Sequence, residues 1–236
     1  MSGTGRPKLL ITGISEGLGA DIAGVFAQAG YDVLGLSRSG RASEQIGAVV
    51  GQAGSNYTHI TCDLTRTTEV QLALSPIAEH IDVLVHNAQL LMMRPFGDIS
   101  PQAFEEVWRV ACFGAMLAAQ AILPHMAARK SGTVIFSGAT AGRRGGANFT
   151  AFASAKFALR GLAQALAREF GPKGVHVTHV VIDGLIDTPK TDQRFGPAQA
   201  GRMDSQAIAR AYLQLATQEP SAWTQEMDLR PFTEKF

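Results

Sequence analysis

The stretch Thr12-Gly13-Ile14-Ser15-Glu16-Gly17-Leu18-Gly19 joins a short apolar segment, Lys8–Thr12 (KLLIT), to a segment with helical spacing of apolar residues, Gly19–Ala29. Glycines permit a tight turn and a close approach of backbone to a pyrophosphate, and the helix that follows offers free N–H groups and a positive dipole end. The position between a first strand and a first helix is what makes this glycine pattern informative. We therefore expect a dinucleotide to be held by Gly13, Ser15, Glu16, Gly17, Leu18 and Gly19.

Strands and helices alternate along the chain. After Lys8–Thr12, the segments expected to be strands are Asp32–Leu36, Tyr57–Thr61, Val83–His86, Thr133–Ser137 and His176–Ile182. The longest helical segments between them are Pro101–Met126 and Ala151–Phe170. This alternation indicates βαβ units with a parallel sheet, and nearly all-apolar strands indicate helices on both faces. We predict one α/β domain over residues 1–236, with a doubly wound parallel sheet in three α/β/α layers.

Two segments near the C-terminus are less regular. Pro189–Met203 is rich in polar residues, proline and glycine, and is predicted to be a loop or a short mobile helix. Ligands of an open α/β sheet bind beyond the carboxyl ends of the strands, so we expect this segment, about residues 189–203, to cover the substrate. The tail Trp223–Phe236 is either the last strand plus an oligomer contact or a docked terminus.

Composition restricts the class of partner. The chain has 236 residues, of which 46% are apolar and 17% charged, and its net charge is +1. This is the balance of a globular protein with a large core, and the small net charge predicts neither nucleic acid nor a membrane surface as partner. No apolar stretch is expected to reach transmembrane length and no signal-peptide pattern is evident, so we expect a cytoplasmic protein. Cys62 and Cys112 are interpreted as small buried residues without a disulfide.

The end of the second expected strand, Leu36-Ser37-Arg38, bears on the choice of dinucleotide. An acidic residue there would bind the ribose 2′-hydroxyl of NAD, and none is present. Arg38 can meet a 2′-phosphate instead, so we expect NADP in preference to NAD. Glu16 argues against NADP if its carboxylate lies near that phosphate. The alternative interpretation of Arg38 is an ordinary arginine in a surface loop. The neighbours able to help Arg38 are Ser37, Ser39 and Arg41.

Further motifs follow the later strands. They are Asp63 after the third strand, His86-Asn87-Ala88 after the fourth, Lys156 in a late helix, and Asp183-Gly184 followed by Thr188. With the glycine turn, in this order and spacing, they resemble the short-chain dehydrogenase/reductase family over essentially the whole chain. The resemblance implies a Rossmann-type domain that binds NADP(H) or NAD(H). It implies that Asp63 contacts the adenine, Asn87 lines the cofactor, Lys156 holds the nicotinamide ribose and Thr188 faces the carboxamide. The neighbouring residues expected to touch the cofactor are Leu64, Ala88, Gly184 and Ile186.

The chain departs from the family at the usual Asn-Ser-Tyr-Lys tetrad. Counted from Lys156, the tyrosine position is Phe152, the serine position is Ala139 and the asparagine position is Ala111. In the family the tyrosine exchanges a proton with the substrate oxygen during hydride transfer, a task that phenylalanine cannot perform. Lys156 alone retains its polar group, as a cation with three donors beside the ribose hydroxyls.

Three polar residues near the expected nicotinamide remain candidates for catalysis: Lys156, Thr140 and Asp183. Asp187 lies in the same turn as Asp183 and could act in its place. The alternative for both carboxylates is that they cap the turn or a following helix through backbone N–H groups, and we favour it because Asp is common in turns for that reason.

Other chemistry-bearing residues are not expected in the site. Tyr31, Tyr57 and Tyr212 fall in segments predicted to be remote from it. His176 and His179 lie on opposite faces of the sixth strand because their spacing is odd, so they cannot form a metal pair. We expect no metal site.

Three functions stay open. The first is an atypical oxidoreductase that transfers hydride between NADP(H) and a small apolar substrate, such as an iminium, an enone or a carbonyl, without the usual tyrosine. The second is a non-redox enzyme, such as a cyclase, isomerase or lyase, and the third is a pseudoenzyme; both would use the cofactor structurally. The expected partners are a small-molecule substrate and, as the family implies, further copies in a homodimer or homotetramer through the fourth and fifth helices.

Overall fold

The computed structural model of the protein describes residues 5–197 and 201–234. Parallel strands form one seven-stranded sheet in the order β3-β2-β1-β4-β5-β6-β7. The strands are β1 (Lys8–Thr12), β2 (Asp32–Ser37), β3 (Tyr57–Thr61), β4 (Val83–His86), β5 (Thr133–Ser137), β6 (His176–Ile182) and β7 (Glu226–Leu229). The chain first builds outward from β1 to β3 and then returns to place β4 on the other side of β1. The strand order therefore reverses between β1 and β4.

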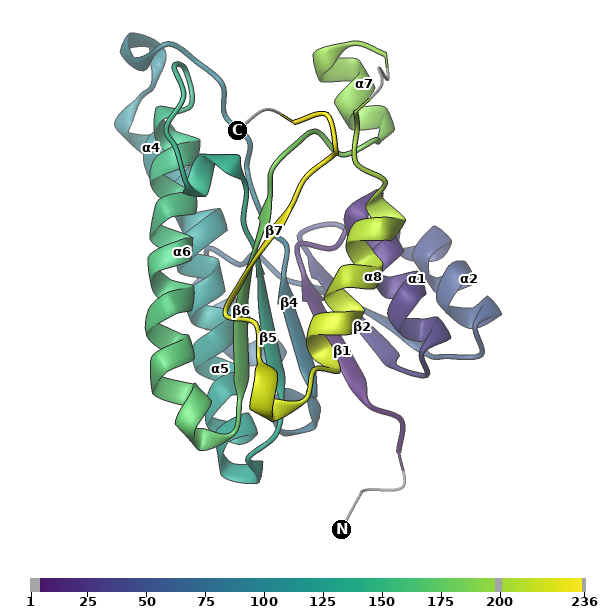
Figure 1. The fold of residues 1–236 in the computed structure, drawn as a ribbon. Helices are drawn as coiled ribbons and strands as arrows, with labels where there is room; N and C mark the ends of the chain where they lie inside the picture. The colour runs from purple at the N-terminus through teal and green to yellow at the C-terminus, as the bar shows by residue number, and fades with distance from the viewer. Residues whose placement is uncertain (1–4, 198–200, 235–236) are drawn as a thin grey trace.

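Helices cover both faces of this sheet (Figure 1). They are α1 (Leu18–Gln28), α2 (Ser43–Gln52), α3 (Thr67–Leu74), α4 (Pro101–Trp108), α5 (Gly114–Arg129), α6 (Thr150–Phe170), α7 (Pro189–Phe195) and α8 (Ser205–Ala216). Helices α1, α2 and α8 pack together on one face, and α3 to α6 pack on the other. The predicted three-layer α/β/α architecture with a doubly wound parallel sheet is confirmed.

The alternation of side chains along each strand explains why the strands are apolar throughout. In β1, Leu10 belongs to the apolar core under α5 and α6, whereas Leu9 and Ile11 belong to the core under α1 and α8. Successive side chains of a strand point to opposite faces, so a sheet covered on both faces needs apolar residues at every position. The side chains of Leu9, Leu10 and Ile11 are fully buried.

The six predicted strands lie where the sequence placed them, and β2 is one residue longer than expected. The C-terminal tail contains the expected last strand, because β7 pairs with β6. The predicted helix 101–126 is interrupted by a π-helical turn, Arg109–Phe113, that joins α4 to α5. Such a turn has no signal in hydrophobic periodicity, which explains why the sequence did not predict it.

The expectation that no apolar stretch reaches transmembrane length was wrong. The continuous helical stretch Pro101–Arg129 is long and apolar enough to cross a membrane by length and composition. In this structure, however, α5 contributes Ala115, Ile122 and Met126 to the core beneath the sheet, and each is fully buried. A core helix and a membrane helix have similar composition, so length and hydropathy alone are weak evidence for a span.

The carboxyl ends of the central strands meet at the point where the strand order reverses. Gly13 N–H donates to Leu36 O at 2.7 Å and Asn87 N–H donates to Thr12 O at 2.9 Å. These bonds tie the turns after β1, β2 and β4 together. Ligands of doubly wound sheets bind in the crevice at such a reversal, so the fold itself indicates where to look for a site.

Candidate functional site

The turn after β1 has the conformation that a dinucleotide requires. Gly13 has φ +77°, and a Cβ added to it would overlap the Cα of Ala88 in the turn after β4. Gly17 has φ +83° and is the N-cap of α1. Positive φ and a close approach between two turns both favour glycine. Gly17 forms no side-chain cap, so the first N–H groups of α1 are the donors that this turn can offer to a phosphate.

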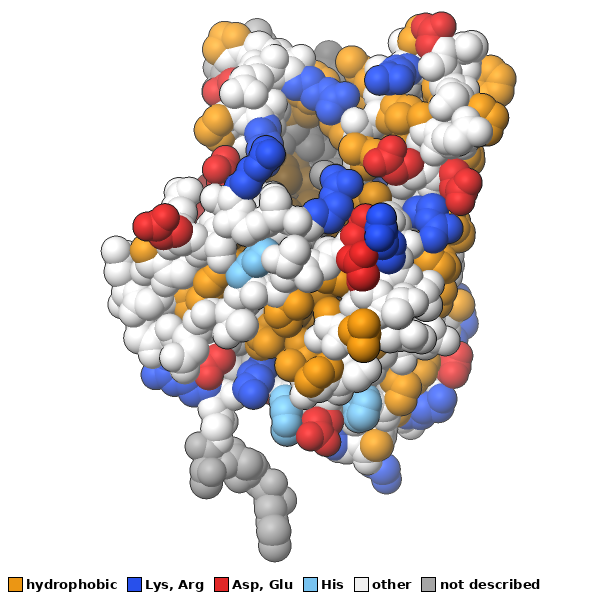
Figure 2. All heavy atoms as spheres, turned by 180° about the vertical axis from the view of Figure 1, so that it is seen from behind, with side chains coloured by type: hydrophobic (Ala, Val, Ile, Leu, Met, Phe, Trp, Pro, Cys, Tyr) orange, Lys and Arg blue, Asp and Glu red, His pale blue; other side chains and the backbone are white. Residues whose placement is uncertain are grey.

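A pocket of about 540 Å³ opens beside this turn. Figure 2 shows a hollow at this end of the molecule with basic side chains around its mouth. Nine of the residues predicted to bind the cofactor line the pocket: Gly13, Ser15, Glu16, Ser37, Arg38, Asp63, Leu64, Asn87 and Ala88. Its dimensions and its glycine cradle fit a dinucleotide.

The other predicted cofactor residues do not line this pocket. They are Gly17, Leu18, Gly19, Lys156, Gly184, Ile186 and Thr188. Leu18 and Gly19 are buried in the first turn of α1, and Gly184 lies against Pro231 and Met203. The hydroxyl of Thr188 caps α7 by accepting from the N–H of Thr191, while its methyl group lies beside Gly17.

The part of the pocket after β2 is basic. Arg38, Arg41 and Lys190 line it together with the two acids Glu16 and Asp63. Burial opposes the ionisation of Asp63, but hydrogen bonds from Thr65 and the charges of Arg38 and Arg66 outweigh it and lower the pKa of this carboxyl. Sequence reasoning missed Lys190 as a pocket residue, although its segment was expected to cover the site.

The Ser37 hydroxyl, which lines the pocket, is hydrogen-bonded within the protein in this structure. Its hydroxyl donates to Ser39 O at 2.9 Å, so the nitrogen of His59 that lies 2.9 Å away must act as the donor to Ser37 Oγ. The single proton of this hydroxyl is therefore committed to the turn that carries Arg38. Ser37 therefore holds the turn, and the guanidinium groups of Arg38 and Arg41 are charged donors on this wall of the pocket.

Lys156 in α6 is fully buried, and its Nζ donates to Ser137 O at the end of β5 at 2.8 Å. Burial lowers the pKa of Lys156 to about 7. Its Nζ also lies 5.6 Å from the centre of the Phe152 ring, one helical turn earlier. Because no part of Lys156 reaches solvent, contact with a ribose requires the side chains over Nζ to move.

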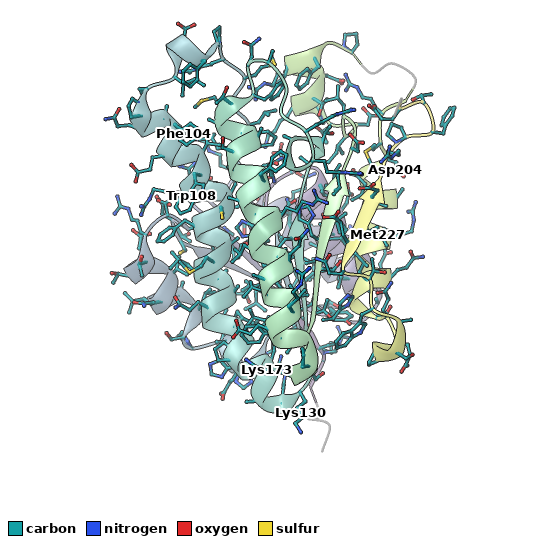
Figure 3. All side chains as sticks on the ribbon, turned by 60° about the vertical axis from the view of Figure 1, so that its left-hand side comes forward. Phe104, Trp108, Lys130, Lys173, Asp204 and Met227 are labelled. Carbon is teal, nitrogen blue, oxygen red and sulfur yellow. The ribbon has the colours of Figure 1, made fainter. Side chains whose placement is uncertain are left out.

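The positions Ala111, Ala139 and Phe152 come together. All three belong to one apolar cluster beneath α4 and α6, with Ala111 from the π-helical turn and Ala139 from the turn after β5. Phe104 of α4 packs against the same cluster, and Figure 3 shows it on the helix beside α6. This cluster lies next to Lys156 because Phe152 and Lys156 share α6.

His86, at the end of β4, links this cluster to β1. Its Nε2 lies 3.1 Å from Ala111 O, which can only accept, so Nε2 donates and Nδ1 accepts from the Thr12 hydroxyl at 2.8 Å. A neutral imidazole satisfies both bonds. Burial and the charge of Lys156 lower the pKa of His86 to about 3, although the bond to Ala111 O acts in the opposite sense.

This burial predicts an acid-dependent loss of stability. The folded-state pKa of His86 lies below the unfolded value of about 6.5, so its contribution is present above that pH and is lost as pH falls towards about 3. We expect the free energy of unfolding to fall by about 1.4 kcal/mol per pH unit for this one proton. Urea unfolding at pH 7, 6, 5 and 4.5 measures it. The His86→Asn protein should show a slope shallower by about that amount, and equal slopes would contradict the assignment.

Thr140 and Asp183 also come together, as the two catalytic candidates near the turn after β6. The Thr140 hydroxyl donates to Asp183 Oδ1 at 2.5 Å, and Arg230 lies 3.6 Å from Asp183 Oδ2. The alternative interpretation of the two aspartates as caps is not what the structure shows. Asp183 accepts from side chains, Asp187 pairs with Arg202 at 3.7 Å, and the side chain that caps α7 belongs to Thr188.

Tyr212 was expected to be remote from the site, and this was wrong. Its hydroxyl donates to Ser137 Oγ at 2.9 Å, on the residue whose carbonyl holds Lys156. The ring comes from α8, which packs on the opposite face of the sheet from α6. Burial raises the pKa of Tyr212, and its side chain is fully enclosed. Tyr212 therefore holds the Ser137 side chain in place, and its buried hydroxyl is inaccessible to a substrate.

The remaining chemistry-bearing residues have structural surroundings. Cys62 and Cys112 are buried and free, and burial with the nearby carboxylates raises the pKa of Cys62 to about 11. His176 contacts Leu215 O while His179 contacts Glu226, so they face opposite ways as predicted. Within residues 5–197 and 201–234, no three His, Cys, Asp or Glu side chains gather as a metal site would need.

A glycine turn between β1 and α1, a basic pocket at the strand-order reversal and a buried lysine on α6 define a dinucleotide-binding α/β protein. Residues 8–197 match the family described as short chain dehydrogenase, and the chain belongs to this family. The short-chain reductase protein NovJ of Streptomyces niveus is 31% identical over 229 residues, which cover 94% of this chain and 86% of NovJ.

Solved structures agree with this. A short-chain dehydrogenase from Rhodopseudomonas palustris superposes with a TM-score of 0.83 at 33% identity, covering 96% of this chain and 99% of that one. A metagenomic short-chain oxidoreductase in complex with NADP superposes with a TM-score of 0.84 at 25% identity, covering 98% and 99%.

Proposed function

We propose that this protein is an NADP(H)-dependent oxidoreductase that transfers hydride to or from a small apolar substrate without a tyrosine as acid or base. The observation that carries the proposal is the apolar cluster of Ala111, Ala139 and Phe152 beside Lys156. At the place where the family's resemblance implies a proton donor, this chain offers methyl groups and a phenyl ring.

Each residue around the cluster has a distinct role in this proposal. The bound dinucleotide supplies or accepts the hydride. Phe152 and Ala139 give the substrate an apolar wall that excludes water, and Ala111 is buried behind them. Lys156 donates a hydrogen bond to the ribose after the side chains that cover its Nζ have moved. The Thr140 proton is committed to Asp183, so Thr140 Oγ1 remains an acceptor for an N–H or O–H group of the substrate.

This arrangement favours an iminium among the three substrate classes. An iminium carries its own positive charge, so hydride can join its carbon while nitrogen takes the electron pair, and no acid is needed. An enone needs a proton at carbon, which water can supply. A plain ketone suffers most, because a positioned general acid contributes about 10²- to 10⁴-fold to such a reduction.

The test begins with binding and continues with turnover. Purified protein is titrated with NADPH and NADH, and the absorbance of the reduced cofactor is then followed with panels of iminium, enone and ketone substrates. We expect oxidation of NADPH with an iminium or enone and little with ketones. Tight NADPH binding with no oxidation in any panel would overturn the proposal. It would favour a non-redox enzyme or a binding protein in which the cofactor has a structural role.

The preference for NADP is tested at Arg38. The Arg38→Ser substitution removes a charge-assisted donor from the pocket wall, which is expected to weaken NADPH binding about 30-fold and NADH binding less than about threefold. Fluorescence titration of both reduced cofactors measures the ratio. Arg168→Ser serves as the control, since Arg168 is exposed on α6 and donates to Gln164 O in its own helix. Equal losses for NADPH and NADH would show that Arg38 does not read the 2′-phosphate.

A further inference from the structure

The carboxylate of Asp183, in the turn after β6, is enclosed with few partners. Its side chain is only 9% exposed. Within residues 5–197 and 201–234, the Thr140 hydroxyl is the one hydrogen-bond donor to this carboxylate, at 2.5 Å. An ionised carboxylate can accept about four hydrogen bonds and is costly to enclose without partners. Asp183 therefore has acceptor capacity and charge left for a ligand.

Arg230 compensates the charge of Asp183 only in part. Its Nη2 lies 3.6 Å from Asp183 Oδ2, beyond hydrogen-bond distance, and 3.1 Å from Asp228 Oδ2. Asp228 also pairs with Arg143. Two guanidinium groups thus meet the outer carboxylate of Asp228, whereas the enclosed carboxylate of Asp183 shares one of them at a greater distance.

Thr140 and Asp183 lie at the edge of the apolar wall proposed for the substrate. Ala139 and Ala141, on either side of Thr140 in the turn after β5, both pack against the cluster that contains Phe152. The turns after β5 and β6 are neighbours because these strands pair in parallel. Ligands of a doubly wound sheet bind at this edge, so a substrate packed against the wall has Thr140 and Asp183 at its polar end.

We propose that Asp183 is a specificity-determining residue that selects a positively charged substrate, by pairing its carboxylate with the charge of an iminium. This inference deepens the proposed function and rests on it. The bound dinucleotide supplies the hydride. The hydride joins the iminium carbon, the nitrogen takes the electron pair of the C=N bond, and the substrate leaves as a neutral amine. Asp183 acts before this step, because charges attract strongly where water is excluded.

A charged and an uncharged substrate of similar size test this role. The probes are N-methyl-dihydroisoquinolinium, a permanent cation, and benzylideneacetone, a neutral enone. Values of kcat/KM for NADPH-dependent reduction are measured for the wild type and Asp183→Asn. The asparagine oxygen can still accept from Thr140, so the substitution removes the charge and keeps the hydrogen bond. We expect the ratio of kcat/KM, cation over enone, to fall about 30-fold, mainly through a higher KM for the cation.

Variants of the two neighbouring charges should move this ratio in opposite directions. Arg230→Met removes the cation that Asp183 shares, so the ratio should rise about threefold. Asp228→Asn leaves the charge of Arg230 to act on Asp183, so the ratio should fall about threefold. The side chain of Asp228 is 36% exposed, and its substitution provides the test if Arg230→Met does not fold. A merely structural disturbance of the turn would affect the reduction of both substrates together.

A matched control removes a carboxylate far from the substrate. Asp82 precedes β4, at the opposite end of the strands from the site, and accepts from the N–H of Lys8 at 2.8 Å. Asp82→Asn changes the net charge by the same amount as Asp183→Asn and keeps an acceptor oxygen. The ratio should change by less than about twofold, because solvent and salt screen charges over such a separation.

Binding of an unreactive cation gives a readout that does not depend on turnover. N,N-dimethyl-tetrahydroisoquinolinium carries a permanent charge and has no C=N bond to reduce. Its Kd is measured by titration calorimetry in the presence of NADPH. We expect Asp183→Asn to raise this Kd about 30-fold and Arg230→Met to lower it about threefold.

Three results would overturn the inference. Asp183→Asn could leave the ratio and the Kd as in the wild type, it could weaken the reduction of both substrates equally, or the wild type could fail to bind the unreactive cation. In each case, reduction of benzylideneacetone by the wild type leaves the proposed function standing. If the wild type oxidises NADPH with neither substrate, the proposed function fails, and the affinity for the unreactive cation still decides whether Asp183 binds positive charge.

Discussion

Phe152→Tyr is expected to raise NADPH-dependent reduction of simple ketones by about 100-fold or more over the wild type. Phe152 stands one helical turn before Lys156, and its ring centre lies 5.6 Å from Lys156 Nζ. A hydroxyl added to this ring would place a proton donor in the apolar cluster beside a cation, and a neighbouring cation lowers the pKa of a phenol. Initial rates with a panel of ketones at saturating NADPH measure the gain.

The companion variants isolate the hydroxyl as the cause. Phe152→Leu keeps the position apolar and should show no gain in ketone reduction. Adding Ala139→Ser to Phe152→Tyr should raise the rate further, because Ala139 faces the same cluster and its hydroxyl can orient the carbonyl. If folded Phe152→Tyr binds NADPH as the wild type does and still reduces no ketone, the missing tyrosine is not what sets the activity of this protein.

Gly13→Ala is expected to abolish dinucleotide binding and to cost about 3 kcal/mol or more in the free energy of unfolding. The added Cβ would overlap the backbone of Ala88, which cannot rotate away as a side chain can. It would also place a non-glycine residue at φ +77°. The turns after β1 and β4 would be forced apart at the floor of the pocket. Thermal unfolding and NADPH titration measure the two losses.

Two further glycines separate the causes. Gly30 has φ +90° with open space around a built Cβ, so Gly30→Ala pays only the conformational cost of about 1–2 kcal/mol and should bind NADPH normally. Gly17→Ala meets only the methyl group of Thr188 at 3.0 Å and should fold even if Gly13→Ala does not. We expect Gly17→Ala to weaken NADPH binding at least about tenfold. Unchanged binding in both Gly13→Ala and Gly17→Ala would show that the dinucleotide lies elsewhere.

The sheet was predictable from local sequence because each strand is a short apolar run bounded by polar or glycine-containing turns. Leu9, Leu10 and Ile11 all had to be buried, and only a sheet with helices on both faces buries successive residues of one strand. The π-helical turn Arg109–Phe113 was not predictable in this way. Its apolar spacing is close to that of the α-helix on either side, and the structure distinguishes the two only by hydrogen bonding.

The pocket was predictable where residues follow the ends of strands, because parallel strands bring those ends to one edge. Arg38, Asp63 and Asn87 line it for that reason. Lys190 was missed because its segment folds back over the pocket from beyond β6, and the direction of such an excursion is set by tertiary contacts such as the bridge from Ile186 to Met203. Tyr212 was misplaced because nothing local in α8 reveals that its hydroxyl reaches through to β5.

The sequence by itself determined that this chain is a doubly wound α/β protein with a glycine turn built for a dinucleotide, since apolar runs, glycines and their spacing are local properties. Only the tertiary structure decided which side chains surround the site and what each of them contacts. It gathered Ala111, Ala139 and Phe152 into one apolar cluster, buried Lys156 against Ser137 O, and joined Thr140 to Asp183. These residues lie far apart in the chain, and burial, hydrogen-bond partners and pKa depend on which of them the packed helices bring within a few ångströms of each other.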